Sequence, residues 1–144
     1  MSFERTPLFR GEGNLDTLLA SLQPQLDAAV YVFCTVPSDK PVPANIQPIC
    51  QFTESEGMTL IVEQTQAAKV GLESVYPCHR ITLTVHSDLA AVGLLATVTQ
   101  VLATAGISVN AISAYYHDHL FVPCDRADDA MACLQTLTTD SQSA

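Results

Sequence analysis

The stretch Asp88 to Ser113, DLAAVGLLATVTQVLATAGISVNAIS, contains a glycine at a point where backbone groups could do chemistry. Gly93 lies one turn into an apolar helical pattern. A helix start exposes N–H groups and the positive end of the helix dipole, which together favour a bound carboxylate. Because glycine has no side chain, a ligand could approach the backbone closely there. The same glycine could instead serve only tight helix packing, and residue type alone does not separate these interpretations.

A second group of reactive side chains is the tripeptide from His117 to His119, HDH, which we expect at the tip of a hairpin. Two histidines could suggest a metal ion, but a turn would separate them and no second cluster completes a coordination shell. We therefore expect no metal site. Asp118 could be an ordinary solvated turn aspartate. Asn110, a polar residue in a predicted strand, could line a pocket or point to water.

Composition excludes several classes of protein. The chain has 144 residues, 48% of them hydrophobic, enough for a core in one domain or two very small ones. Fifteen acidic residues against six basic ones give a net charge of −9, which disfavours nucleic acid and anionic membrane surfaces. The start, MSFERTPLFRG, has no secretory signal, and no apolar run approaches the roughly 18 residues of a membrane span. We expect a cytoplasmic protein.

The sequence lacks motifs that would indicate a disulfide framework, a zinc site, catalysis or a bound cofactor. The five cysteines are scattered without a C-x-x-C pair, which argues against a disulfide framework or a zinc knuckle. No nucleophile-and-base pair, phosphate loop or cofactor motif is present. We therefore expect neither an enzyme nor a cofactor.

The predicted elements determine how these residues could be positioned. Asn14 could cap the first helix, Gly106 suits a left-handed C-cap, and Asp125 could cap the last helix with Asp128 and Asp129 at the positive end of its dipole. Periodicity and turn residues predict a helix over 14–27, a strand over 29–36, an irregular proline-rich loop over 37–48, a hairpin with strands 49–53 and 58–62, a short helix over 64–72, a strand over 80–86, a helix over 88–105, a hairpin with strands 107–115 and 120–122, and a helix from residue 125 to a disordered tail at 139–144.

A weak internal repeat sets the domain organisation. Residues 51–68 laid over 113–130 match hairpin to hairpin and place Glu56 on Asp118. The C-terminal half follows the ferredoxin-like βαββαβ order without its last strand, for which the stretch Tyr31 to Val36 is the best candidate. We expect an α+β fold with antiparallel sheets and helices on one face. Residues 1–78 would form a degenerate N-terminal unit and residues 79–138 the C-terminal unit.

The C-terminal half resembles a known module. The stretch HRITLTVHSDLAAVGLLATVTQVLATAGISVNAISAYYHDHLFVP is similar to an ACT domain, a small amino-acid-binding regulatory unit. More narrowly, AISAYYHDHLFV resembles the tandem ACT proteins related to aspartate kinase regulatory regions and to the cytosolic arginine sensor of animals. PICQFTESEGMTLIVE resembles the degenerate repeat that precedes it in that group. The resemblance covers about residues 29 to 138.

The resemblance implies where a ligand would bind. In the arginine-sensor relatives an acid at the position of Asp118 lies in the ligand pocket, where it would contact the ligand's cationic group, and Glu56 has the analogous position in the first hairpin. His86, Ser87 and Asp88 fall where phosphoglycerate-dehydrogenase-type loops carry a histidine and an asparagine that hold serine. The aspartate in place of that asparagine argues against serine. The expected ligand-binding residues are Ser87, Asp88, Val92, Gly93, Leu94, Asn110, Ile112, Asp118 and Glu56.

The resemblance also implies a function. We expect a non-catalytic sensor or regulatory protein that holds an amino acid or similar small ligand at an interface between ACT units. ACT units usually pair through sheet edges or helices, so a homodimer is expected. The output would pass to an unidentified regulated protein. The alternative is a protein–protein interaction module whose pocket is empty.

Overall fold

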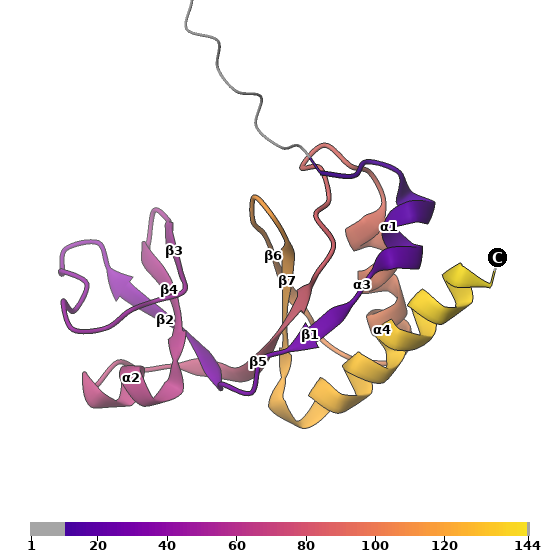
Figure 1. The fold of residues 1–144 in the computed structure, drawn as a ribbon. Helices are drawn as coiled ribbons and strands as arrows, with labels where there is room; N and C mark the ends of the chain where they lie inside the picture. Colours follow the sequence, from indigo (N-terminus) through magenta and orange to yellow (C-terminus); the bar gives the residue numbers. More distant parts are fainter. Residues whose placement is uncertain (1–10, 144) are drawn as a thin grey trace, which may run out of the picture.

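A computed structural model describes residues 11–143 of the chain (Figure 1). Its seven strands form one bent antiparallel sheet in the order β3-β4-β2-β5-β7-β6, with β1 also paired to β5. The predicted α+β, ferredoxin-like tandem fold is confirmed. The elements are α1 (Leu15–Ser21), β1 (Pro24–Leu26), β2 (Tyr31–Pro37), β3 (Cys50–Thr53), β4 (Gly57–Glu63), α2 (Gln64–Lys69), β5 (Val75–Leu83), α3 (Leu94–Thr104), β6 (Asn110–Ser113), β7 (Asp118–Pro123), a 3-10 turn (Cys124–Arg126) and α4 (Ala127–Gln142).

Strand β5 joins the two halves of the sheet. Its first residues pair with β2, and its last residues pair with β1 on one side and β7 on the other. The sheet bends at this strand, so that β2, β3 and β4 form one arm and β6 and β7 form the other (Figure 1). β5 therefore runs over Val75–Leu83 rather than over the predicted 80–86, because pairing with β2 extends its start.

The strand that completes the C-terminal unit is β1, whose three residues lie opposite the stretch Ile81 to Leu83. Our prediction of Tyr31 to Val36 for this place was wrong, because β2 pairs only with the first part of β5. Asn14 caps α1 as predicted: its Oδ1 accepts a hydrogen bond from the N–H of Thr17 at 3.0 Å. Pro24 has no N–H and biases the preceding residue toward extended backbone, so α1 ends at Ser21, and part of the predicted helix is β1.

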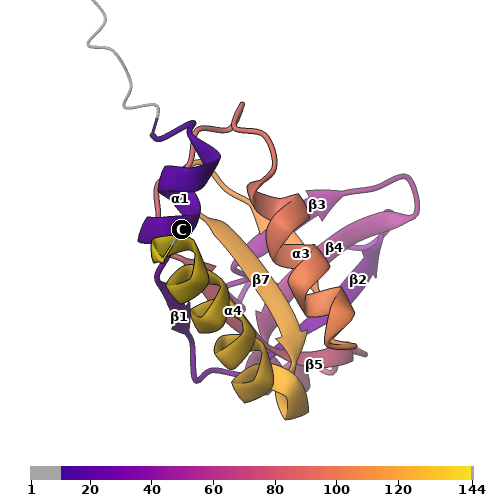
Figure 2. The same ribbon diagram turned by 90° about the vertical axis from the view of Figure 1, so that its right-hand side faces the viewer.

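The convex face of the sheet carries the helices, as predicted. α1, α3 and α4 lie side by side over the C-terminal arm (Figure 2), whereas α2 and the proline-rich loop cover the N-terminal arm. Alternation along each strand sends every second side chain into these two cores. The largest fully buried residues of the C-terminal core are Leu18, Leu22, Ile81, Leu83, Leu102, Leu120 and Leu134.

The concave face of the sheet has its own apolar centre. Tyr31 and Phe33 from β2 make edge-to-face contacts with Phe121 from β7, with ring centroids 6.1 and 5.9 Å apart. Cys78 is buried beside them. Pairs of this kind add to the stability that area burial provides. None of the helices in residues 11–143 is long and apolar enough to cross a lipid bilayer.

The C-terminal segment differs from the sequence prediction in two ways. Asp125 lies in a 3-10 turn and makes no cap, since the N-cap position of α4 is Arg126 and has no side-chain cap hydrogen bond. The predicted disordered tail at 139–144 is wrong for its first residues, because α4 continues to Gln142. The side chain of Gln142 donates to the carbonyl of Ala20 at 2.8 Å, which anchors the end of α4 on α1.

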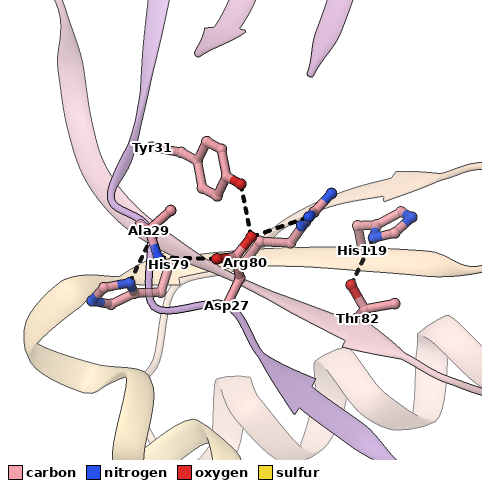
Figure 3. Close-up of polar contacts among 7 residues, drawn as sticks. All are labelled: Asp27, Ala29, Tyr31, His79, Arg80, Thr82 and His119. Carbon is pink, nitrogen blue, oxygen red and sulfur yellow. Dashed lines mark hydrogen bonds and ion pairs between the residues drawn. The ribbon is translucent and has the colours of Figure 1, made fainter. Parts of the chain in front are cut away.

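A polar cluster ties the β1–β2 connection to β5 (Figure 3). Asp27 accepts hydrogen bonds from the Tyr31 hydroxyl at 2.7 Å, from the N–H of Ala29 at 3.0 Å and from Arg80 Nη2 at 3.1 Å. Burial alone would raise the pKa of Asp27, but these three donors and the charge of Arg80 outweigh burial and lower it below its ordinary value of 3.8. The ionised carboxylate is therefore part of the folded structure.

Asp27→Asn is expected to lower the free energy of unfolding at neutral pH, by an amount that shrinks in acid. Because the pKa is lower in the folded chain than in the unfolded chain, the ionised group stabilises the fold above pH 3.8, and this contribution is lost as the pH falls through the folded-state value. Urea unfolding at about pH 7 and about pH 3 measures the effect. Asp39→Asn, in the exposed proline-rich loop, is the control. A deficit of equal size at both pH values would contradict the prediction.

Candidate functional site

A cavity of about 150 Å3 lies where the start of α3 faces the β6–β7 hairpin. It brings together five of the residues expected from sequence, which lie up to 31 positions apart along the chain. Those five are Ser87, Asp88, Gly93, Leu94 and Asp118. Its other lining residues are Leu89, Ala91, Leu95, Ala96 and Ser113. The carboxylate and the helix start that the sequence separates therefore share one cavity.

Asp118 reaches this cavity because of the hairpin register. The turn is formed by the stretch Ala114 to His117, whose ends are joined by a hydrogen bond of 3.0 Å, so the predicted tip at HDH is wrong. Asp118 is instead the first residue of β7, opposite Ser113 on one side and Leu83 on the other. Alternation then turns Asp118 toward the helices, together with Leu120.

Asp118 is the one buried residue with a charged side chain among residues 11–143, with 7% of its surface exposed. Its carboxylate has no hydrogen bond or ion pair with any residue of that part of the chain. Buried carboxylates are normally paired, since the loss of hydration is costly. Asp118 therefore has the free acceptor atoms that a cationic ligand group requires.

The start of α3 offers donors to the same cavity. The helix begins at Leu94 rather than at the predicted Asp88, because Asp88 makes a turn with Ala90 and Ala91 and because Gly93 adopts φ +101°. Gly93 is the N-cap and has no side chain to cap the helix, so the first-turn N–H groups have no side-chain acceptor. Three residues of that turn, Leu94 to Ala96, line the cavity. Uncapped N–H groups and the helix dipole favour an anionic group there.

The loop that leads to α3 is braced by the N-terminal segment. Glu12 donates its N–H to the carbonyl of His86 and accepts from the N–H of Asp88, both at 2.8 Å. Gly11 packs so closely on His86 that an added Cβ would lie 2.6 Å from its carbonyl oxygen. The His86 ring contacts Tyr116, with centroids 5.2 Å apart, which links the loop to the hairpin tip. These contacts hold the loop before α3 and the β6–β7 hairpin, which lie on two sides of the cavity.

Four of the expected ligand-binding residues lie outside this cavity. Val92 is 84% exposed, and Asn110 is exposed at the edge strand β6. Ile112 lies on the concave side of the sheet, because neighbouring strand residues face opposite ways. Glu56 is an exposed residue of the β3–β4 turn, on the other arm (Figure 1). Among residues 11–143, no group of three His, Cys, Asp or Glu side chains could hold a metal ion.

Comparison with known families agrees with the architecture. ACT-domain models match the chain twice, over residues 10–79 and over residues 75–136. The chain is a tandem ACT-domain protein. ACT domains are in general regulatory ligand-binding modules. No curated protein sequence matches the chain.

Solved structures share the tandem ACT fold. A Vibrio cholerae protein of unknown function, described as a possible transport protein, is 43% identical over 86% of this chain and 95% of its own, with a TM-score of 0.76. An Agrobacterium tumefaciens protein is 14% identical over 81% of this chain and 89% of its own, with a TM-score of 0.67. The regulatory subunit of aspartate kinase from Thermus thermophilus, in a ligand-free form, is 13% identical over 83% of this chain and 98% of its own, with a TM-score of 0.59.

Sequence reasoning missed part of the cavity of this ACT protein. Ser113 enters because it is the strand partner of Asp118, which the misplaced hairpin tip concealed. The aromatic contacts of Tyr115 and Tyr116 with His86 were also missed. A four-residue turn at 114–117 would have been found by extending the apolar alternation of β7 back to Asp118.

Gly93→Ala is expected to destabilise the ACT fold by about 1–2 kcal/mol. Alanine is strained at φ +101°, and its Cβ would lie 3.0 Å from Leu15 Cδ2 on α1. The absence of a side chain at Gly93 thus allows α1 to pack closely here, while the backbone of Gly93 lines the cavity. Chemical denaturation measures the loss. Gly13→Ala, where an added Cβ meets nothing within 4 Å, should stay within about 0.5 kcal/mol, and equal losses in both variants would contradict the role of backbone strain and packing at Gly93.

Proposed function

We propose that this protein is a non-catalytic amino-acid sensor whose ligand occupies the cavity between α3 and the β6–β7 hairpin. The observation that carries the proposal is the unpaired carboxylate of Asp118, 7% exposed, in a cavity that also holds the uncapped start of α3. An amino acid carries a carboxylate and an ammonium group close together. Its carboxylate would accept hydrogen bonds from the first-turn N–H groups, and its ammonium group would pair with Asp118.

The surroundings of the cavity favour a small ligand with little negative charge. Asp88 is a second carboxylate at the site, and its Oδ1 already accepts from the N–H of Ala90 at 2.7 Å. A dicarboxylic amino acid would therefore meet like charge. A volume of about 150 Å3 suits a small or medium amino acid. Binding would shift the population toward the arrangement in which loop and hairpin hold the ligand together.

We further propose that the site is completed in a homodimer and that the signal passes to a separate cytoplasmic protein. Leu89 and Val92, in the loop that borders the cavity, are 67% and 84% exposed, so this loop presents two large apolar side chains to solvent beside the cavity. A second copy that covers this loop would close the cavity and place the ligand at an interface between ACT units. Light scattering is expected to give twice the mass of one chain, and a monomer at all concentrations would reject the dimer.

Thermal denaturation of the full chain with each of the common amino acids tests the function. A ligand present at about 100 times its Kd adds about 2.7 kcal/mol to the free energy of unfolding, so a binder should raise Tm clearly. The carboxamide derivative of the same amino acid is the control, since it lacks the carboxylate for α3. Ligand-free protein that responds to none of these amino acids would reject the proposal and favour an interaction module with an empty pocket.

A further inference from the structure

A second cavity lies on the opposite face of the β6–β7 hairpin, inside the bend of the sheet. Its volume is about 110 Å3. Most of its walls are apolar, and two nitrogen-bearing side chains, Arg80 and His119, lie among them. The lining residues are Ile49, Cys50, Arg80, Ile112, Ala114, His119 and Phe121. Because Asp118 and His119 are neighbours in β7, they face different cavities, and this second cavity is separate from the proposed amino-acid site.

The side chain of Arg80 is held in place, but some of its N–H donors have no acceptor among the described residues. Its Nη2 donates to Asp27 at 3.1 Å, and its guanidinium carbon lies 5.6 Å from the centroid of the Tyr31 ring (Figure 3). Its Nε is buried and has no hydrogen-bond partner among the described residues. Nη1 likewise has no acceptor in that part of the chain. A buried N–H without an acceptor is costly, so the fold leaves donors that an added acceptor would satisfy.

His119 supplies a second donor beside Arg80. Its Nδ1 lies 3.0 Å from the hydroxyl of Thr82 (Figure 3), and when that hydroxyl donates, the ring proton is on Nε2. Burial lowers the pKa of His119, and the positive charge of Arg80 lowers it further. The neutral ring therefore adds a hydrogen-bond donor and no second charge, which keeps the cavity suited to one negative group.

We propose that this cavity binds a short-chain monocarboxylate, with the carboxylate on Arg80 and His119 and the alkyl chain against Ile112 and Phe121. Arginine presents its donors in a planar fork that matches a carboxylate, and a partner such as Asp27 fixes that fork before binding. The apolar walls exclude a highly charged ligand such as a nucleotide. The small volume limits the alkyl chain to a few carbons.

Sodium butyrate and its neutral isostere butyramide are the probes, and NMR of the full 15N-labelled chain is the measurement. Butyrate is expected to shift the Nε–H signal of Arg80 and the amide signals of Ile112 and Phe121 in a saturable way, with Kd on the order of 1 mM. Butyramide and equal sodium chloride should leave them in place. The Nε–H signal of Arg126, which is already bonded to Asp129 at 3.1 Å, should not move.

Substitutions at Arg80 and at the cavity wall test whether butyrate binds at this site. Arg80→Gln is expected to weaken butyrate binding at least tenfold, whereas Arg126→Gln, which removes the other paired arginine of the described residues, should change it less than twofold. If Arg80→Gln does not fold, Ala114→Leu blocks the cavity and should give the same loss. Asp118→Asn should leave butyrate binding intact, because Asp118 does not line this cavity. Failure of the amino-acid proposal can therefore be told apart from failure of the butyrate proposal. An unmoved Arg80 signal at about ten times the expected Kd, or equal shifts with butyramide, would overturn the proposal.

Discussion

Asp118→Asn is expected to weaken amino-acid binding about ten- to a hundredfold while the protein stays folded. A hydrogen bond to a charged group contributes about 1.5–3 kcal/mol, and each 1.4 kcal/mol is a factor of ten in Kd. Asparagine keeps the shape of the side chain and loses its charge. Because the Asp118 carboxylate has no partner among residues 11–143, the substitution removes no contact within them.

Isothermal titration with the amino acid that gives the largest thermal shift measures this loss. Asp140→Asn, an exposed carboxylate near the end of α4, is the matched control and should bind as the wild type does. The unfolding midpoint of the Asp118→Asn variant should equal or exceed that of the ligand-free wild type, since a buried charge has been removed. Wild-type affinity in the Asp118 variant would mean that the ligand's cationic group binds elsewhere.

Leu134→Ala is expected to lower the free energy of unfolding by about 2–5 kcal/mol. Leu134 is fully buried on α4, in the core that also contains Leu18 of α1 and Leu102 of α3. A cavity at this point removes contacts on several elements at once, because α4 lies beside α1 and α3 over the C-terminal arm (Figure 2). Since natural domains are stable by only about 5–15 kcal/mol, this is a large share of the total.

Thermal unfolding should place Tm of the Leu134 variant about 10 °C below the wild type. Gln135→Ala, the exposed next residue of α4, should change stability by no more than about 0.5 kcal/mol. Equal midpoints for the two variants would show that α4 does not contribute to the core in the way described. The same scan in the presence of ligand would show whether the site depends on α4.

Local patterns were sufficient for much of this fold. The hairpin of β3 and β4 follows from two apolar runs around the turn residues Ser55, Glu56 and Gly57, and the structure has it within a residue of the predicted ends. Asn14 and Gly106 are at a helix start and a left-handed helix end as predicted, because capping depends on neighbours within one turn. The order of elements then led to the tandem arrangement.

The candidate site was predicted only in part, because sequence patterns group residues that are close along the chain. Ser87, Asp88 and Gly93 are close in sequence, so a loop entering a helix was enough to group them. Asp118 was chosen by resemblance, yet its expected location at a turn was wrong. Glu56 was assigned from an internal repeat, but the two hairpins lie on different arms of the sheet (Figure 1). Similar local sequence does not place two residues in one cavity.

The amino-acid sequence by itself determined most of the periodic elements, the caps at Asn14 and Gly106, the packing of helices on one face of the sheet and the acidic charge, because these depend on residue types a few positions apart. Only the tertiary structure decided that Pro24 to Leu26 leaves the first helix to pair with β5, and that β7 begins at Asp118. It also decided that the segment around Glu12 holds the loop before α3. Each of these depends on hydrogen bonds between residues distant along the chain, whose free energy outweighs local propensity and leaves no short-range pattern in the sequence.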